Sequence, residues 1–356
     1  MKVSRVILVD GNPPWVRSLM LAVAATGVEV ESLRPHMISK STPIEKIDQP
    51  RFHQSQLALP GWSKFGWLST RIVARRVRRM GAADAVLYTL PQYAGVAEMI
   101  RGPVCAYFAH DPFKFYDWNV ETTQRLEQRM LDRCDVVFAI SEALSQDFRK
   151  ITKTPVETLR NAVSRSFIDR LRTPPPVPAD LAAIGRPVIG CVGQISENAY
   201  DWDLIAALAE KLPRAWFVFV GPVFSQTPTI KQIMAMPNVR WLGAKPHDQL
   251  PAYLNGFDVC FNPLRPGEHS DRRSPLRLYD YLATNKPILS TAIGEAYGHR
   301  PLIEIGQSAD ECARLILKMT DGDYSIDLEA RRRYIEENTW ENRARELLRR
   351  LETCRP

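Results

Sequence analysis

The sequence predicts two α/β domains in tandem, each with a doubly wound parallel sheet. Short apolar runs alternate with helical patterns in both halves of the 356-residue chain, as they do in βαβ units. Four prolines within residues 172–178 interrupt this alternation, because proline continues neither a helix nor a central strand. The alternation then begins again, and we therefore place a linker at the prolines and a second domain after it.

The expected elements follow from the length and period of each apolar run. Strands are expected at residues 6–9, 85–90, 104–108, 136–140, 188–192, 216–220, 239–242, 259–262 and 288–291. Helices are expected at residues 16–26, 120–133, 204–211, 276–284 and 328–352. The expected organisation is an N-terminal domain over residues 1–172, a linker over 173–186, a C-terminal domain over 187–327, and a C-terminal helix over 328–356 that packs back on the N-terminal domain. Two such domains form a cleft, and ligands of these sheets bind at the carboxyl ends of the strands.

The net charge of +7 is unevenly distributed. Residues 1–175 hold 25 Lys and Arg against 17 Asp and Glu, a balance of +8, whereas residues 176–356 hold 22 against 23, a balance of −1. A positive field of this kind attracts nucleic acid or an anionic membrane surface.

Neither a spanning helix nor a signal peptide is expected. No run reaches about 18 apolar residues, and Asp10 interrupts the first apolar run early. The six cysteines are scattered without C-x-x-C spacing, which indicates a reduced, cytoplasmic protein without disulfides or zinc.

Residues 60–80 are strongly basic. They hold two tryptophans and six basic residues, and no acidic residue occurs between Asp48 and Asp84. Their periodicity predicts an amphipathic helix with arginines beside an apolar face. Such a helix can lie on an anionic membrane, or it can bury its apolar face in the core, and the two roles are compatible. The residues expected to contact a membrane are Trp62, Trp67, Arg71, Arg75, Arg78 and Arg79.

Two segments of the second half have residue types that suit a nucleotide. Gly193 ends a strand, so its backbone can approach a diphosphate and leave amide groups free to donate, although a tight turn without a ligand has the same pattern. Pro275 is placed to open a helix, and Arg277 and Asp280 share a face near the start of that helix. Arg277 offers a charged fork to phosphate oxygens, and Asp280 offers an acceptor to ribose hydroxyls. The alternative for this pair is a surface ion pair.

Residues 274–290 resemble the donor-site helix of group 1 glycosyltransferases, whose pattern runs roughly P-x-K-L-x-E-Y-L-A-x-G-K-P. Arg277 stands in place of the Lys, Asp280 in place of the Glu, and Asn285 in place of the Gly. Further segments resemble the family in the right order and spacing, and together they cover most of residues 100–300; they are residues 134–144, 160–163, 187–193, 201–205, 217–222, 238–243 and 250–259. The resemblance implies the GT-B fold, in which two Rossmann-like domains face each other across a cleft.

The resemblance also implies the parts of a donor site. The base is expected near Trp241, the ribose at Asp280 and the diphosphate at Arg277. The family's E-x7-E pattern would place its first Glu, which usually faces the donor sugar, at Arg272, so Glu268 is the expected replacement; a solvated loop is the alternative. The residues expected to bind the donor are Gly193, Gln194, Trp241, Leu242, Glu268, Pro275, Leu276, Arg277 and Asp280.

Polar residues also end two expected strands of the first half. His110 and Asp111 follow residues 104–108, and Asp10 and Asn12 follow residues 6–9, which places all four at carboxyl ends. We expect Asp111 or His110 to take the acceptor proton in an inverting reaction, whereas in a retaining reaction His110 would hold the donor sugar. The alternative for Asp111 is a turn residue before proline. Asp10 and Asn12 are expected to touch the acceptor.

The predicted function is transfer of a sugar from a UDP- or GDP-sugar to a glycan acceptor, lipid-linked, at the cytoplasmic face of the cell membrane. The nucleotide sugar is a co-substrate, and no separate cofactor is expected. No metal is expected either, because Asp201 and Asp203 open a helix instead of forming a D-x-D motif after a strand, and Arg277 can neutralise a diphosphate.

Two other classes of protein stay open. A sugar-nucleotide 2-epimerase has this architecture, but it gives residues 60–80 no role. A non-enzymatic nucleic-acid-binding protein is suggested by charge alone, without a recognisable RNA or DNA motif, and we therefore expect no nucleic-acid partner.

Overall fold

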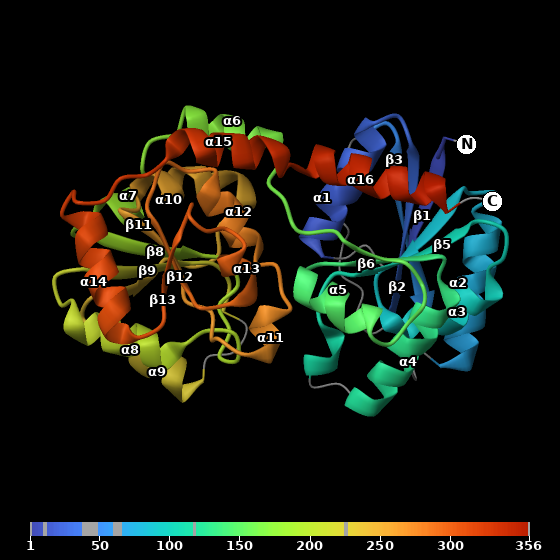
Figure 1. The fold of residues 1–356 in the computed structure, drawn as a ribbon, viewed down its shortest axis with the longest axis horizontal. Helices are drawn as coiled ribbons and strands as arrows, with labels where there is room; N and C mark the ends of the chain where they lie inside the picture. Colours follow the sequence, from blue (N-terminus) through green and yellow to red (C-terminus); the bar gives the residue numbers. More distant parts are fainter. Residues whose placement is uncertain are drawn as a thin grey trace. The chain divides into compact units, whose positions relative to one another are not determined.

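The computed structural model describes residues 2–9, 13–37, 49–59, 66–116, 119–223 and 227–354, which form two compact units (Figure 1). The first unit comprises Met1–Asn161, Arg272–Ser274 and Trp340–Pro356, and the second comprises Ala162–Asp271 and Pro275–Thr339. The predicted residues Asp10, Asn12 and Trp62 lie outside the described ranges.

The first unit is built on a seven-stranded parallel sheet with the order β3-β2-β1-β4-β5-β6-β7. Its central strands are buried along their whole length, as expected of a parallel sheet that helices cover on both faces. The strands are β1 (Arg5–Val9), β2 (Glu29–Met37), β3 (Phe52–Leu59), β4 (Ala85–Tyr88), β5 (Val104–Ala109), β6 (Val136–Ala139) and β7 (Val156–Thr158).

In the first unit, helix α3 packs against both α2 and α4, and α1 packs against α16. Side chains cap several of them; Asn119, for example, accepts a hydrogen bond from the amide of Thr122 at the start of α4. Their bounds are α1 (Pro14–Ala25), α2 (Trp67–Arg79), η2 (Pro91–Tyr93), α3 (Ala94–Met99), η3 (Phe113–Phe115), α4 (Val120–Arg133), α5 (Glu142–Arg149) and α16 (Trp340–Thr353).

The second unit is built on a six-stranded parallel sheet with the order β10-β9-β8-β11-β12-β13. Its strands are β8 (Val188–Val192), β9 (Trp216–Val220), β10 (Val239–Trp241), β11 (Val259–Asn262), β12 (Ile288–Thr291) and β13 (Glu304–Gly306). Its helices are α6 (Arg165–Arg172), α7 (Ala179–Ala182), α8 (Trp202–Lys211), α9 (Pro228–Met234), η4 (His247–Gln249), α10 (Leu250–Gly256), α11 (Glu268–Asp271), α12 (Leu276–Leu282), α13 (Gly294–Tyr297), α14 (Ala309–Thr320) and α15 (Leu328–Glu337). The predicted fold class, two doubly wound α/β sheets, is confirmed.

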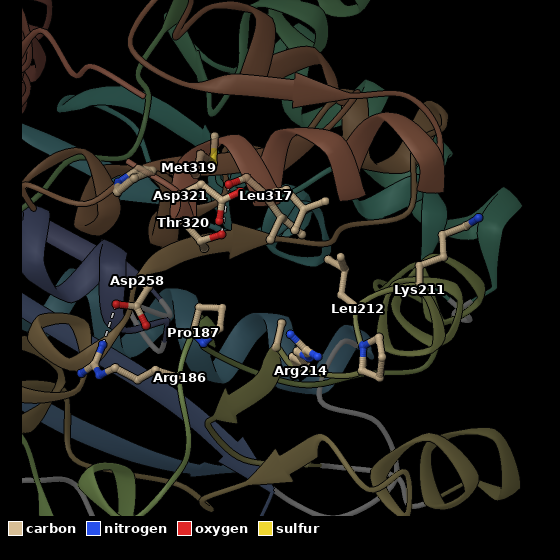
Figure 2. Close-up of a pocket in the computed structure, with 14 residues that line it drawn as sticks. Arg186, Pro187, Lys211, Leu212, Arg214, Asp258, Leu317, Met319, Thr320 and Asp321 are labelled. Atoms are coloured by element: carbon tan, nitrogen blue, oxygen red, sulfur yellow. Dashed lines mark hydrogen bonds and ion pairs between the residues drawn. The ribbon is translucent and has the colours of Figure 1, made fainter. Parts of the chain in front are cut away.

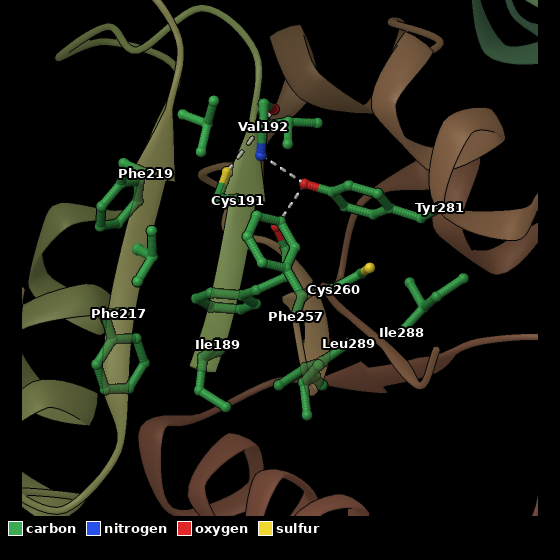
Figure 3. Close-up of a cluster of buried hydrophobic side chains, with 14 of the residues drawn as sticks. Ile189, Cys191, Val192, Phe217, Phe219, Phe257, Cys260, Tyr281, Ile288 and Leu289 are labelled. Atoms are coloured by element: carbon green, nitrogen blue, oxygen red, sulfur yellow. Dashed lines mark hydrogen bonds between the residues drawn. The ribbon is translucent and has the colours of Figure 1, made fainter. Parts of the chain in front are cut away.

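Buried hydrophobic side chains of the second unit pack around β8 (Figure 3). Gly190 lies against the ring of Phe257, and a side chain at this position would overlap that ring. The phenol of Tyr281, on α12, accepts a hydrogen bond from the amide of Val192 (2.9 Å) and donates one to the carbonyl of Phe261 (3.2 Å). These contacts anchor α12 beside the carboxyl end of β8.

The structure corrects one predicted element. Residues 328–352 form two helices, α15 and α16, instead of one. The helix breaks because the backbone of Asn338 and Thr339 pairs with Val163. The carbonyl of Asn338 accepts a hydrogen bond from the amide of Val163 (3.2 Å), and Thr339 forms a β-bridge with Val163. Helix α15 belongs to the second unit, where the buried Arg331 donates to the carbonyls of Leu302 and Lys286, whereas α16 packs on α1 of the first unit.

Candidate functional site

Three glycine turns follow neighbouring strands at the carboxyl edge of the second sheet. Gly193, Gly221 and Gly243 come after β8, β9 and β10, and all three have positive φ angles, of 113°, 155° and 77°. The amide of Gly193 donates to the carbonyl of Val220, and that of Gly221 donates to the carbonyl of Gly243, both at 2.9 Å. A Cβ atom on Gly221 would overlap the backbone of Gly193. The edge therefore presents closely packed backbone, which is how such sheets approach phosphate groups.

Arg277 reaches this edge from α12. One terminal nitrogen of its guanidinium lies 3.4 Å from Cys191 Sγ, its Cζ lies 5.0 Å from the centre of the Tyr200 ring, and another terminal nitrogen lies 3.1 Å from where a Cβ of Gly193 would be. In the described part of the chain, Arg277 has no carboxylate within ion-pair distance, so the predicted alternative, an ion pair with Asp280, is absent. A guanidinium stays charged at any physiological pH, and a charge packed among a thiol, a phenol and backbone favours an anionic ligand.

Asp280 lies one helical turn beyond Arg277, and its side chain is only 6% exposed. The ion-pair partner that the described residues offer is His247, whose Nε2 lies 3.8 Å from Asp280 Oδ2. The interaction with the Asp280 carboxylate raises the pKa of His247; burial lowers it, the charge of Asp248 raises it further, and Arg170 lowers it. The structure thus places a histidine at the predicted ribose acceptor, which the sequence pattern did not reveal because 33 residues separate the two positions.

The other predicted donor residues occupy varied positions. Trp241 is 41% exposed at the end of β10, and its indole nitrogen donates to the carbonyl of Gly221 (2.8 Å). Leu242 is half-buried, Gln194 is exposed, and Glu268 is exposed on the short helix α11. Pro275 is the N-cap residue of α12 and Leu276 its first residue, so the predicted helix start is observed. Asp201 caps α8 by accepting from the amide of Leu204, as expected of a helix start.

Arg272, which stands at the position of the family's first Glu, belongs to the first unit. Its Nε lies 2.5 Å from Asp147 Oδ2 on α5, and Lys114 Nζ lies 3.7 Å from the same oxygen. Arg272 therefore forms an ion pair with Asp147 of the first unit. Its positive charge is opposite to that of the Glu in the family's pattern.

His110 and Asp111 follow β5 in the first unit, and both are buried. The ring of His110 lies edge-on to Trp15 and Phe113, with ring centres 5.8 and 5.2 Å apart. Asp111 Oδ2 accepts from the Tyr116 hydroxyl at 2.5 Å, whereas Oδ1 is within ion-pair distance of Arg273 Nε (3.3 Å) but accepts no hydrogen bond from the described residues. Burial and the neighbouring Asp111 carboxylate raise the pKa of Tyr116, so this phenol remains a donor. Asp111 therefore has two neighbours, Arg273 and Tyr116, that hold its carboxylate in place.

The first unit contains a buried carboxylate that the sequence pattern does not predict. Glu127 lies on the core face of α4, where its Oε1 accepts from the Tyr107 hydroxyl on β5 (2.8 Å). Burial raises the pKa of Glu127 to about 7, while the hydrogen bond from Tyr107 and the charge of Lys114 lower it. The charged pattern of α4 hides this residue among solvent-facing ones.

Helix α2 presents its arginines to solvent. Its buried side is formed by Ser69, Val73, Ala74 and Val77, so the predicted core packing of this helix is observed. Trp67 is 71% exposed, and the guanidinium of Arg71 lies 5.3 Å from the centre of its ring. Arg75 and Arg79 are exposed as well, and Arg78 is exposed while donating to the carbonyl of Met99.

A cavity of about 790 Å³ lies at the opposite, amino-terminal edge of the second sheet (Figure 2). Pro187, Ala215, Asp258 and Pro287 line it, each directly before a strand. At its rim, Arg186 and Asp258 form an ion pair at 2.6 Å. Because ligands of parallel sheets bind at the carboxyl edge, this cavity is separate from the glycine turns and Arg277.

Comparison with known proteins decides the family of the second half. Residues 186–321 match the family model described as glycosyl transferases group 1. These residues form a group 1 glycosyltransferase domain. Within this glycosyltransferase domain lie all three glycine turns, Arg277, Asp280 and His247. A Bacillus subtilis (strain 168) protein, TuaH, described as a glycosyltransferase of teichuronic acid biosynthesis, is 26% identical over 172 residues. That match spans 46% of this chain and 42% of the relative's length.

Solved structures share the fold of the glycosyltransferase domain and of the rest of the chain. A sucrose-phosphate synthase from Thermosynechococcus elongatus has 17% identity and a TM-score of 0.74, covering 99% of this chain and 100% of that one. A glycosyltransferase from Rickettsia africae has 14% identity and a TM-score of 0.72, covering 99% of both chains. An E. coli trehalose-6-phosphate structure bound with UDP-2-fluoro glucose has 13% identity and a TM-score of 0.72, covering 98% and 99%. The chain has the GT-B fold.

Proposed function

We propose that this protein transfers a sugar from a nucleotide-sugar donor to a glycan acceptor. The observation that carries the proposal is the guanidinium of Arg277, which packs beside the Gly193 turn without a carboxylate partner among the described residues. A pyrophosphate supplies the missing negative charge and accepts from the guanidinium. The group 1 family of residues 186–321 supports this assignment.

The donor's other parts follow from the same edge of the sheet. The Asp280 carboxylate accepts hydrogen bonds from the two ribose hydroxyls, and Trp241 and Leu242 lie beside the base. UDP and GDP are both candidates for the nucleotide. We propose Glu268 as a contact of the donor sugar, since the family's position for that role is Arg272, which is paired with Asp147. No metal is required in this scheme, because Arg277 already supplies the positive charge that the leaving diphosphate needs.

In the first unit, His110 is the better of the two candidates for a role in the reaction. Asp111 forms an ion pair with Arg273 and accepts a hydrogen bond from Tyr116. We therefore propose that Asp111 positions these two side chains. We propose that His110 contacts the transferred sugar or its acceptor, and that Asp10 and Asn12 contribute to acceptor binding.

The acceptor is proposed to be a lipid-linked glycan at the cytoplasmic face of the membrane. Two observations support this: the relative described for teichuronic acid biosynthesis, and the exposed Trp67 and arginines of α2. Each basic residue near an anionic leaflet contributes about 1 kcal/mol of attraction, so the arginines of α2 suffice for reversible attachment. None of the helices in the described ranges is both long and apolar enough to span a bilayer.

A thermal-shift screen of nucleoside diphosphates and nucleotide sugars tests the proposal. A ligand present at about 100 times its Kd stabilises the native state by about 2.7 kcal/mol, which is readily seen as a higher Tm. We expect UDP or GDP and one of the matching sugar nucleotides to raise the Tm, and the free sugars to have no effect. The absence of a shift with every nucleotide would refute the donor site.

Transfer itself is tested with the donor found in that screen. The labelled donor is incubated with a membrane lipid extract, and the label is expected in the lipid phase. Conversion of the donor into its 2-epimer without any acceptor would instead assign the protein to the epimerases.

A further inference from the structure

His247 is brought to Asp280 by the fold alone. It begins η4, in the loop that follows β10, and its Nε2 lies 3.8 Å from Asp280 Oδ2 on α12. The carboxylate is 6% exposed, whereas the imidazole is 57% exposed. The histidine therefore stands between the buried acid and solvent.

The surroundings of His247 favour its protonated form. The Phe167 ring of α6 covers one face of the imidazole, with ring centres 4.9 Å apart and an angle of 31° between the planes, and an aromatic face attracts a cation. The charged groups facing His247 are Asp280 from α12, Asp248 from η4 and Arg170 from α6. Arg170 donates to the carbonyl of Asp248 at 2.8 Å, so two carboxylates oppose one guanidinium that is already engaged. The pKa of His247 is raised, mainly by its interaction with Asp280, and this direction agrees with the geometry.

We propose that His247 is a positioning residue for the nucleotide, which orients the Asp280 carboxylate toward the ribose and places a positive charge beside the anionic donor. The proposal rests on the donor site assigned above, and it adds a consequence that this assignment does not contain. Nucleotide binding should weaken as the pH rises and His247 loses its proton, because the imidazolium stabilises both the Asp280 carboxylate and the bound phosphates. For each unit by which the nucleotide raises the pKa of His247, the affinity falls about tenfold between the two pH limits.

Calorimetric titration of UDP and GDP between pH 5.5 and 9 tests the proposal on four proteins: the wild type, His247→Gln, His247→Lys and His53→Gln. The Gln variant keeps a hydrogen-bond donor without a charge, and the Lys variant keeps a charge at every pH in the range. His53 is a matched control in the first unit, since its side chain is also 57% exposed and its Nε2 lies 2.8 Å from a carboxylate of Glu29. The titration of the nucleotide's own phosphates is common to all four proteins, so only differences between their profiles count.

We expect the wild type and His53→Gln to lose affinity together as the pH rises. His247→Gln should bind with the wild type's weak high-pH affinity throughout, and His247→Lys should retain the strong affinity at pH 9. If His247→Gln follows the wild-type profile, the proposal about His247 is wrong. Asp280→Asn separates the two levels of inference. Loss of binding in this variant with an unchanged His247→Gln profile refutes the role of His247 alone, whereas wild-type affinity in Asp280→Asn overturns the donor site as well.

Discussion

Replacing Arg277 by Ala tests whether its guanidinium binds the diphosphate of the nucleotide. The guanidinium contacts Cys191, Tyr200 and the Gly193 turn, and it has no carboxylate partner in the described part of the chain. Its removal therefore costs the free protein a cation–π contact, worth about 2 kcal/mol when desolvated as it is against the buried Tyr200 ring. The bound state loses charge-assisted hydrogen bonds worth about 1.5–3 kcal/mol, which corresponds to a Kd higher by a factor of about 10 to 150.

The assay is the Tm with and without UDP or GDP at about 100 times the wild-type Kd. At that concentration the nucleotide stabilises the wild type by about 2.7 kcal/mol, and a hundredfold weaker Kd reduces this to about 0.4 kcal/mol. We expect Arg277→Ala to have a moderately lower Tm than the wild type when free and almost no shift with nucleotide. Arg240→Ala is the matched control, because Arg240 also lies over an aromatic ring of the same unit, 4.6 Å from the centre of Trp216.

Two results would refute the reasoning on Arg277. An unchanged nucleotide shift in Arg277→Ala would mean that the diphosphate binds elsewhere. A large fall in the Tm of the free variant, of the size seen on removing one partner of a buried ion pair, would mean that Arg277 has a structural role instead.

Three further predictions concern stability, metal and membrane. Burial raises the pKa of Glu127 from 4.5 to about 7. Between pH 4.5 and 7 the folded state therefore binds more protons than the unfolded state, so the free energy of unfolding falls as the pH rises through this range. Glu127→Gln should remove this slope and be more stable than the wild type in urea at pH 8, by on the order of 3 kcal/mol; parallel pH profiles would contradict the assignment. Turnover of the donor should persist in EDTA because Arg277 neutralises the diphosphate, and complete inactivation that Mn²⁺ restores would overturn this. A quadruple Gln variant of the α2 arginines should no longer sediment with anionic liposomes at low salt while keeping its nucleotide affinity, unlike a control variant with Gln at Arg332, Arg333, Arg345 and Arg349; failure of the wild type to sediment would end the membrane proposal. The α2 positions are Arg71, Arg75, Arg78 and Arg79.

The sequence by itself determined the fold class and most of the second sheet. Strands β8, β9, β11 and β12 have the predicted bounds, because buried parallel strands are continuous apolar runs bounded by turn residues. Strands β2 and β3 were not predicted. They carry polar and charged residues toward the edge of the first sheet, where pairing with a neighbour rather than an apolar pattern determines the extended conformation.

Local patterns also placed Arg277 and Asp280 on one helix, which spacing alone can do. Only the tertiary structure decided what each of them meets. Arg277 lies at the Gly193 turn rather than in an ion pair with Asp280, and Asp280 lies beside His247. Likewise, the pairing of Asp111 with Arg273 joins positions far apart in the sequence. Spacing along a helix specifies which side chains share a face, but contacts between distant segments depend on how the whole sheet packs, and that information is not contained in any one window of the sequence.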